Sequence, residues 1–93
     1  MNVSMADVLV LIRIYPEEPD SDLEDIVDRV RRSLPEKVVL RDYRSEEMGY
    51  GLSSLLVGFT MPDSEGVLEE LEEALRGVEG VSEISVEHVT RIL

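Results

Sequence analysis

The sequence predicts an α+β fold in which a four-stranded antiparallel sheet carries two helices on one face. Four segments have the β-branched or alternating pattern of strands, and two others have apolar residues at helical spacing. These segments follow one another as strand, helix, strand, strand, helix, strand. At 93 residues the chain has the length of one domain with a single modest core.

The first half of the predicted fold is a strand followed by a helix. Residues 7–15 are almost continuously aliphatic and end at a proline, as is typical of a central or fully buried strand. Residues 16–19 are predicted to form a loop. Ser21 and Glu24 have the spacing of a capping box, in which both side chains bind free amides at a helix start. The helix is marked by an apolar stripe formed by Leu23, Ile26, Val27, Val30 and Leu34.

The middle of the chain is predicted to form a hairpin. Residues 38–44 have the composition of a strand that becomes more polar towards its end, as expected at a sheet edge or in a hairpin. Gly49-Tyr50-Gly51 is expected to reverse or bulge the chain, because glycine tolerates positive φ. Residues 52–61 form the next predicted strand. Its inward positions are predicted to be Leu55, Val57, Phe59 and Met61.

The last part of the chain is predicted to form a helix and a final strand. Residues 62–64 are expected to supply N-cap oxygens to the helix, and Gly77 and Gly80 are expected to end it. Its apolar stripe consists of Val67 or Leu68, Leu71, Ala74, Leu75 and Val78. Residues 81–92 alternate as a strand with a phase slip near residues 82–83. The apolar positions of this strand are Val81, Ile84, Val86 and Val89.

This order of elements predicts the ferredoxin-like split βαβ arrangement, written βαββαβ. In that arrangement both helices cover one face of the sheet, so the chain leaves the other face uncovered. The open face leaves room for a partner or for oligomerisation. The architecture hosts many unrelated functions and therefore predicts none of them by itself.

The acidic composition restricts the choice of partner. Nine Lys and Arg residues against twenty-one Asp and Glu residues give a net charge of −12, which argues against direct nucleic-acid binding. A partner with a basic surface is expected, although the same acidity also fits solubility alone or growth in salt or heat. The chain shows no signal-peptide pattern and no apolar run of about 18 residues, so we expect a cytoplasmic protein without membrane contact.

Few residues in the sequence are suited to catalysis or metal binding. The chain has no cysteine, which excludes disulfides, thiolate zinc sites and cysteine nucleophiles. The single histidine, His88, lacks the companion ligands that a transition metal requires. Residues 68–73 are strongly acidic but have no ligand-bearing loop, as is typical of a solvated helix face. Phosphate-loop and RNA-binding patterns are also missing, so we expect no enzyme, no metal site and no cofactor.

Five local motifs lie at residues 5–10, 49–52, 61–66, 77–81 and 86–91. Taken together, these motifs resemble archaeal elongation factor 1-beta. The resemblance implies a ferredoxin-like guanine-nucleotide exchange factor for elongation factor 1-alpha, the GTPase that delivers aminoacyl-tRNA to the ribosome. It also implies that residues 5–93 form a single exchange-factor domain, with Met5 as the usual start. Residues 1–4 are then an extension that we expect to be disordered.

The resemblance assigns candidate partner-binding residues at two places. In the eukaryotic branch of the family, an aromatic residue in a Gly-Phe-Gly-like corner packs against the GTPase. In the same branch a lysine near the C-terminus enters the region of the GTPase that held magnesium and phosphate. Tyr50 and Arg91 occupy the corresponding positions here, although arginine is larger and planar, and Ser53-Ser54 replace lysines of that branch. The expected partner-binding residues are Gly49, Tyr50, Gly51, Leu52, Arg91, Ile92 and Leu93.

Two other kinds of function are compatible with the predicted fold. A small regulatory module that senses a ligand and dimerises through its open sheet face would show ligand-dependent oligomerisation and no effect on GDP release. A small acid phosphatase of the same topology would need an arginine-rich anion loop after the first strand. Residues 16–19 are acidic instead, so the phosphatase ranks last.

Overall fold

The computed structural model describes residues 7–92, and its elements follow the predicted order. The elements are β1 (Asp7–Pro16), α1 (Leu23–Ser33), β2 (Val39–Gly49), β3 (Leu52–Pro62), α2 (Val67–Arg76) and β4 (Val81–Ile92). The extension expected at residues 1–4 and the expected contact residue Leu93 lie outside the described residues.

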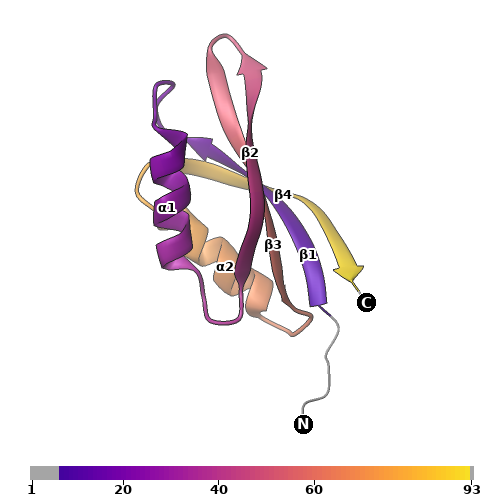
Figure 1. Cartoon of the computed structure of the whole chain (residues 1–93). Helices are drawn as coiled ribbons and strands as arrows, with labels where there is room; N and C mark the ends of the chain where they lie inside the picture. Colours follow the sequence, from indigo (N-terminus) through magenta and orange to yellow (C-terminus); the bar gives the residue numbers. More distant parts are fainter. Residues whose placement is uncertain (1–6, 93) are drawn as a thin grey trace.

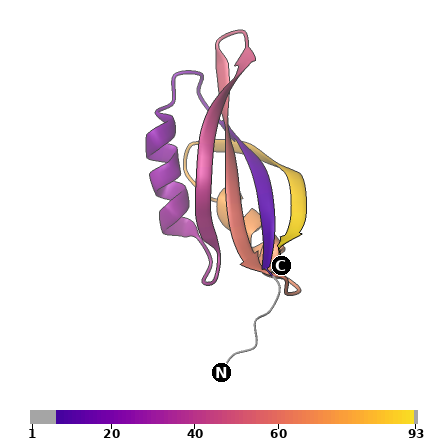
Figure 2. The ribbon, with the colours of Figure 1, turned by 45° about the vertical axis from the view of Figure 1, so that its right-hand side comes forward.

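The four strands form one antiparallel sheet in the order β2-β3-β1-β4. Both helices lie on the same face of this sheet (Figure 1), and the view in Figure 2 shows the opposite face without a covering element. The predicted ferredoxin-like arrangement is therefore confirmed. β1 is a central strand, as its aliphatic composition predicts.

The core lies between the sheet and the two helices. On β1 and β3 every second side chain points to the helices, and the antiparallel register places Val10, Ile12 and Ile14 opposite Phe59, Val57 and Leu55. The inward positions predicted for β3 are thus confirmed. The helices add Ile26, Val27, Val30, Leu71 and Leu75 to the same cluster. Each such side chain contributes about 1.5–3 kcal/mol when fully buried, so this layer holds the sheet and the helices together.

Both helices begin at residues other than the predicted caps. The N-cap of α1 is Asp22, whose Oδ1 accepts hydrogen bonds from the amides of Glu24 (3.1 Å) and Asp25 (3.4 Å). The predicted capping box is wrong because the Ser21 hydroxyl donates instead to the carbonyl of Glu18, at 2.8 Å. This bond makes Ser21 part of the preceding turn.

The N-cap of α2 is Gly66, which has φ 89° and no side-chain cap. The prediction that residues 62–64 supply cap oxygens is wrong because these residues form an extra turn. In that turn the amide of Ser64 donates to the carbonyl of Pro62, and the amide of Val67 donates to that of Ser64.

The strand β2 is longer than predicted, since it continues to Gly49 rather than ending at residue 44. Residues 45–47 remain paired with residues 53–55 of β3, so the two strands form a hairpin arm. The pairing persists although the arm is polar, because backbone hydrogen bonds between two strands do not require apolar side chains. This arm carries the Gly49-Tyr50-Gly51 corner at its tip.

The edge strand β4 contains two irregularities. Pairing with β1 shifts between Glu83 and Val81, which confirms the predicted phase slip, and a second shift between His88 and Val86 was not predicted. Val89 pairs with the buried Val10 of β1 but is itself 50% exposed. An edge strand has no neighbour on its outer side to cover such a residue.

Candidate functional site

The corner between β2 and β3 is a two-residue turn with an unusual backbone. Gly49 pairs with Leu52, and Tyr50 and Gly51 form the loop between them. The φ angles of Gly49, Tyr50 and Gly51 are 90°, 57° and 75°. Positive φ at both loop positions fits a type I′ turn, which usually contains Asn-Gly. A tyrosine in this left-handed region costs about 1–2 kcal/mol, so local folding does not explain the choice of residue.

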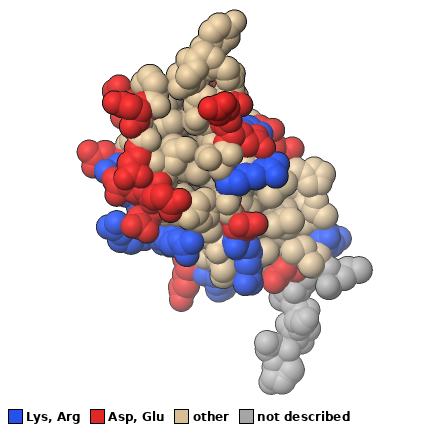
Figure 3. Space-filling model, turned by 45° about the horizontal axis from the view of Figure 1, so that its top comes forward, with Lys and Arg blue, Asp and Glu red and all other residues tan. Residues whose placement is uncertain are grey.

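The side chains at the corner project into solvent. Tyr50 has a relative exposure of 101%, and Met48 and Leu52 on either side are nearly half exposed. No charged residue occurs from Met48 to Pro62. Figure 3 shows an uncharged projection at the top of the molecule, with acidic side chains below it. An exposed apolar cluster on an otherwise acidic protein is a typical contact surface for another protein.

A polar cluster on the open sheet face joins all four strands where the hairpin arm begins. Arg13 of β1 donates through Nη1 to Glu46 Oε1 of β2 at 2.7 Å and to Ser54 Oγ of β3 at 3.0 Å. Its Nε lies 3.7 Å from Glu87 Oε2 of β4, at the second irregularity of that strand. Glu46 also pairs with Arg44, at 2.9 Å. These contacts brace the base of the arm and thereby orient the corner.

The same contacts change the acid–base properties of the cluster. The hydrogen bond from Arg13, together with the charges of Arg13 and Arg44, holds the pKa of Glu46 below its ordinary value. The hydrogen bond to Glu46 in turn raises the pKa of Arg13. Both effects favour the charged forms of Arg13 and Glu46.

The other expected contact region lies at the far end of the sheet. Arg91 Nη2 is 2.6 Å from Asp63 Oδ2, and Asp63 belongs to the loop between β3 and α2. Both side chains are largely exposed. Ile92 pairs with Asp7 at the start of β1 and is also exposed. The cation of Arg91 is therefore held by a carboxylate from another segment in the free protein.

The structure does not bring the two expected contact regions together. The corner lies at one end of the hairpin and the C-terminal end of β4 lies at the other end of the molecule (Figure 1). The strand β3 runs between them with 11 residues, so the regions are about 33 Å apart at a rise of about 3.3 Å per residue. The molecule measures 49 × 21 × 18 Å. A partner that contacts both regions must therefore present a surface of similar length.

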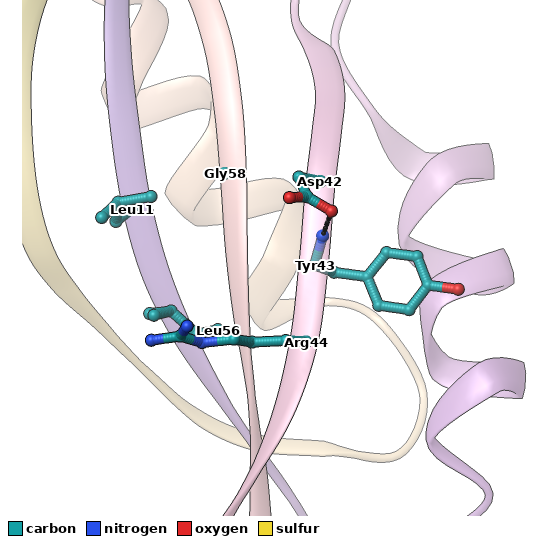
Figure 4. Close-up of a pocket in the computed structure, with 6 residues that line it drawn as sticks. All are labelled: Leu11, Asp42, Tyr43, Arg44, Leu56 and Gly58. Atoms are coloured by element: carbon teal, nitrogen blue, oxygen red, sulfur yellow. Dashed lines mark hydrogen bonds between the residues drawn. The ribbon is translucent and has the colours of Figure 1, made fainter.

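The open sheet face carries a shallow hollow of about 260 Å³. Figure 4 shows Leu11, Leu56 and Arg44 around it, while the ring of Tyr43 points away towards α1. There the Tyr43 hydroxyl donates to Glu24 Oε1 at 2.8 Å, and this bond raises the pKa of Tyr43. A Cβ on Gly58 would lie 3.4 Å from Leu11 Cδ2, so the leucine already covers the strand at that point.

The remaining polar candidates do not assemble into a site within residues 7–92. In that range, no group of three or more His, Asp or Glu side chains lies close enough to hold a metal ion. His88 is exposed on β4 opposite Leu11, and the acidic residues of segment 68–73 lie along the accessible side of α2. Neither described helix is long and apolar enough to cross a membrane.

Sequence reasoning missed the four-strand cluster and the partner of Arg91. The available signal for the cluster was Arg13, a charged residue in the middle of an otherwise aliphatic strand, where an ion requires a partner. Asp63 carried no such signal, because it is brought to Arg91 only by the folding of three strands.

Comparisons with known proteins identify the family of the chain. Residues 9–92 match the family described as the EF-1 guanine nucleotide exchange domain. The elongation factor 1-beta of Ignicoccus hospitalis is 43% identical over 91 residues, which cover 97% of each chain. That of Staphylothermus marinus is 42% identical over 95% of this chain and 99% of its own length. That of Halorubrum lacusprofundi is 39% identical over 95% of this chain and 100% of its own length.

The similar solved structures are more distant. The ACT domain from the GTP pyrophosphokinase of Chlorobium tepidum aligns with a TM-score of 0.57 at 20% identity, over 87% of this chain and 99% of that one. The C-terminal domain of the MgtC protein from Mycobacterium tuberculosis aligns with a TM-score of 0.55 at 16% identity, over 98% of this chain and 93% of that one. At these identities the likeness concerns the fold alone.

The fold and the family match together define a small guanine-nucleotide exchange protein of translation elongation. The chain belongs to the EF-1 guanine nucleotide exchange domain family, whose archaeal members are named elongation factor 1-beta. The resemblance seen in the sequence motifs is thereby confirmed.

Proposed function

We propose that this protein accelerates GDP release from elongation factor 1-alpha, and hence GTP loading, in the cytoplasm. The observation that carries this proposal is the corner at Tyr50, where a fully exposed aromatic ring is held in a disfavoured backbone conformation between two glycines. A ring held clear of the core in this way suits insertion into a pocket of a partner.

Exchange of this kind requires binding energy and no covalent step. A protein that weakens GDP binding to a GTPase must bind the nucleotide-free GTPase more tightly by the same factor. The interactions that matter are therefore those made with the nucleotide-free form. The chain makes and breaks no covalent bond in this scheme.

The corner residues Gly49, Tyr50, Gly51 and Leu52 act as the anchor. Tyr50 enters a pocket on the GTPase, and the two glycines allow the turn that presents it. Central aromatic residues of this kind contribute about 2 kcal/mol or more to binding, which corresponds to a loss of about 30-fold when the ring is removed. The residues next to Tyr50 in the chain, from Met48 to Leu52, are uncharged, which favours desolvation of the contact.

The C-terminal residues Arg91, Ile92 and Leu93 act at the nucleotide. The guanidinium of Arg91 competes electrostatically with the magnesium ion of the GTPase and binds phosphate oxygens through two parallel N–H donors. To do so it must leave Asp63, which holds it in the free protein. Because the pair is exposed, breaking it costs only about 0.2–1 kcal/mol.

Release of a fluorescent GDP analogue from the matching elongation factor 1-alpha tests the proposal. The wild type is expected to accelerate release, Tyr50→Phe to retain the effect, and Tyr50→Ala to lose most of it. Release that is the same with and without the wild-type protein would refute the proposal. Full activity in Tyr50→Ala would refute the role of the corner.

A further inference from the structure

A groove of about 280 Å³ lies beside the corner, between the hairpin arm and the loop that follows β1. The side of the groove on the arm is formed by Met48, Leu52 and Ser53. Its other side is formed by Tyr15, Pro16, Glu17, Glu18 and Pro19. The groove is thus continuous with the exposed apolar side chains that flank Tyr50.

The loop side of the groove is fixed by hydrogen bonds. The amide of Glu17 donates to the carbonyl of Gly80 at 2.9 Å, which ties the loop to the start of β4. The carbonyl of Glu18 accepts from both the amide of Ser21 (3.1 Å) and its hydroxyl (2.8 Å). Two prolines further restrict the backbone. The groove is therefore preformed, and an occupant is not required to order the loop.

The lining of the groove indicates the chemistry of its occupant. Tyrosine, proline, methionine and leucine side chains make an apolar interior, whereas Glu17 and Glu18 place two exposed carboxylates on the rim. The volume lies at the lower limit of the range of about 300–1,000 Å³ that is usual for small-molecule pockets. An apolar side chain accompanied by lysine or arginine matches both the size and the charge of this groove.

We propose that the groove receives an apolar side chain from a Lys- or Arg-flanked segment of the GTPase surface, next to the pocket that takes Tyr50. This inference rests on the proposed exchange function. The contact with the GTPase then includes the groove as well as the ring of Tyr50, and the carboxylates of Glu17 and Glu18 favour a basic segment. The net charge of −12 attracts the same segment at long range.

The test measures the GDP-release rate of the matching GTPase against the concentration of each variant at several salt concentrations. The charge variant is Glu17→Gln with Glu18→Gln, and its matched control is Glu69→Gln with Glu70→Gln on α2, away from the groove. Met48→Ser tests the apolar side. Circular dichroism and the thermal midpoint establish that each variant is folded.

We expect the groove charge variant to raise KM about two- to tenfold at low salt with unchanged kcat, and to weaken the salt dependence of KM. We expect Met48→Ser to raise KM and to keep the wild-type salt dependence. The inference is overturned if the groove charge variant has the KM of the wild type or the same KM as its α2 control. If the wild type itself does not accelerate release, the proposed function fails, and that outcome is distinct from failure of the groove.

Discussion

Tyr50 occupies a backbone position that favours asparagine or glycine. Packing within the fold does not offset this backbone strain, because the ring is fully exposed. In the proposed role of Tyr50, function and stability therefore oppose each other at this residue, which is common where a site is held for a partner.

This opposition gives a prediction for Tyr50→Asn. Asparagine tolerates the left-handed conformation, so we expect the free energy of unfolding to rise by about 0.5–1 kcal/mol. We also expect exchange activity to fall as in Tyr50→Ala. Urea denaturation and GDP release measured on the same sample check both parts. A less stable Asn variant would show that the tyrosine stabilises the turn.

A second residue-scale prediction concerns the pair of Arg91 and Asp63. Asp63→Asn removes the charge that competes for the guanidinium, so we expect kcat for exchange to rise about two- to fivefold. Asp7→Asn removes one negative charge at the same end of the sheet and serves as the control. Slower exchange in Asp63→Asn would instead mean that Asp63 positions Arg91 for its role.

At the scale of elements, the hairpin arm depends on the cluster around Arg13. Strands β2 and β3 continue beyond their pairing with the rest of the sheet, and two strands alone are only marginally stable. The contacts of Arg13 with Glu46 and Ser54, and the neighbouring Glu87, tie the base of the arm to the central strand and to β4.

The lowered pKa of Glu46 makes this brace sensitive to acid. Because its pKa in the folded state lies below the ordinary value of 4.5, the unfolded chain binds this proton first as the pH falls. The stabilisation is therefore complete above about pH 4.5 and is lost as the pH falls through the folded-state pKa.

We predict that Glu46→Gln is less stable than the wild type at pH 7 and that its thermal midpoint declines less steeply between pH 5 and pH 3. Glu47→Gln removes a charge from the next residue of β2 without removing a bond to Arg13, and it should decline like the wild type. Parallel declines of the wild type and Glu46→Gln would contradict the role of this hydrogen bond.

The elements themselves were largely predictable because their apolar periodicity is strong. Val10, Ile12 and Ile14 on one strand, and Leu71 and Leu75 on one helix, are buried as their spacing requires. The errors occur where local chemistry has several solutions. Asp22 and Ser21 both suit a helix cap, and only the turn made by Glu18 decides between them. The end of β2 was not predicted as strand because it is polar; it is stabilised by pairing with β3 rather than by burial.

The candidate site was predictable in part. The motif around Tyr50 and the resemblance it supports located the corner, and its turn geometry followed from the two glycines. The contact between Arg91 and Asp63 joins residues 28 positions apart in the sequence and depends on the register of β1 with β3 and β4. The groove could not be predicted either, since residues 15–19 and 48–53 meet only in the folded chain.

At the scale of the whole molecule, the distance between the two proposed contact regions predicts different roles for them. A narrow protein 49 Å long can hold the body of a GTPase with one end and act on its nucleotide with the other. Removal of the anchor should weaken binding, whereas removal of the C-terminal cation should slow release within the complex. The two effects are then separable in KM and kcat.

The most direct test is a titration of GDP release from elongation factor 1-alpha with the wild type, Tyr50→Ala, Arg91→Ala and the double variant. The account predicts that Tyr50→Ala raises KM about 30-fold, that Arg91→Ala lowers kcat about tenfold with a smaller change in KM, and that both effects occur in the double variant. Wild-type kinetics in both single variants would contradict the account.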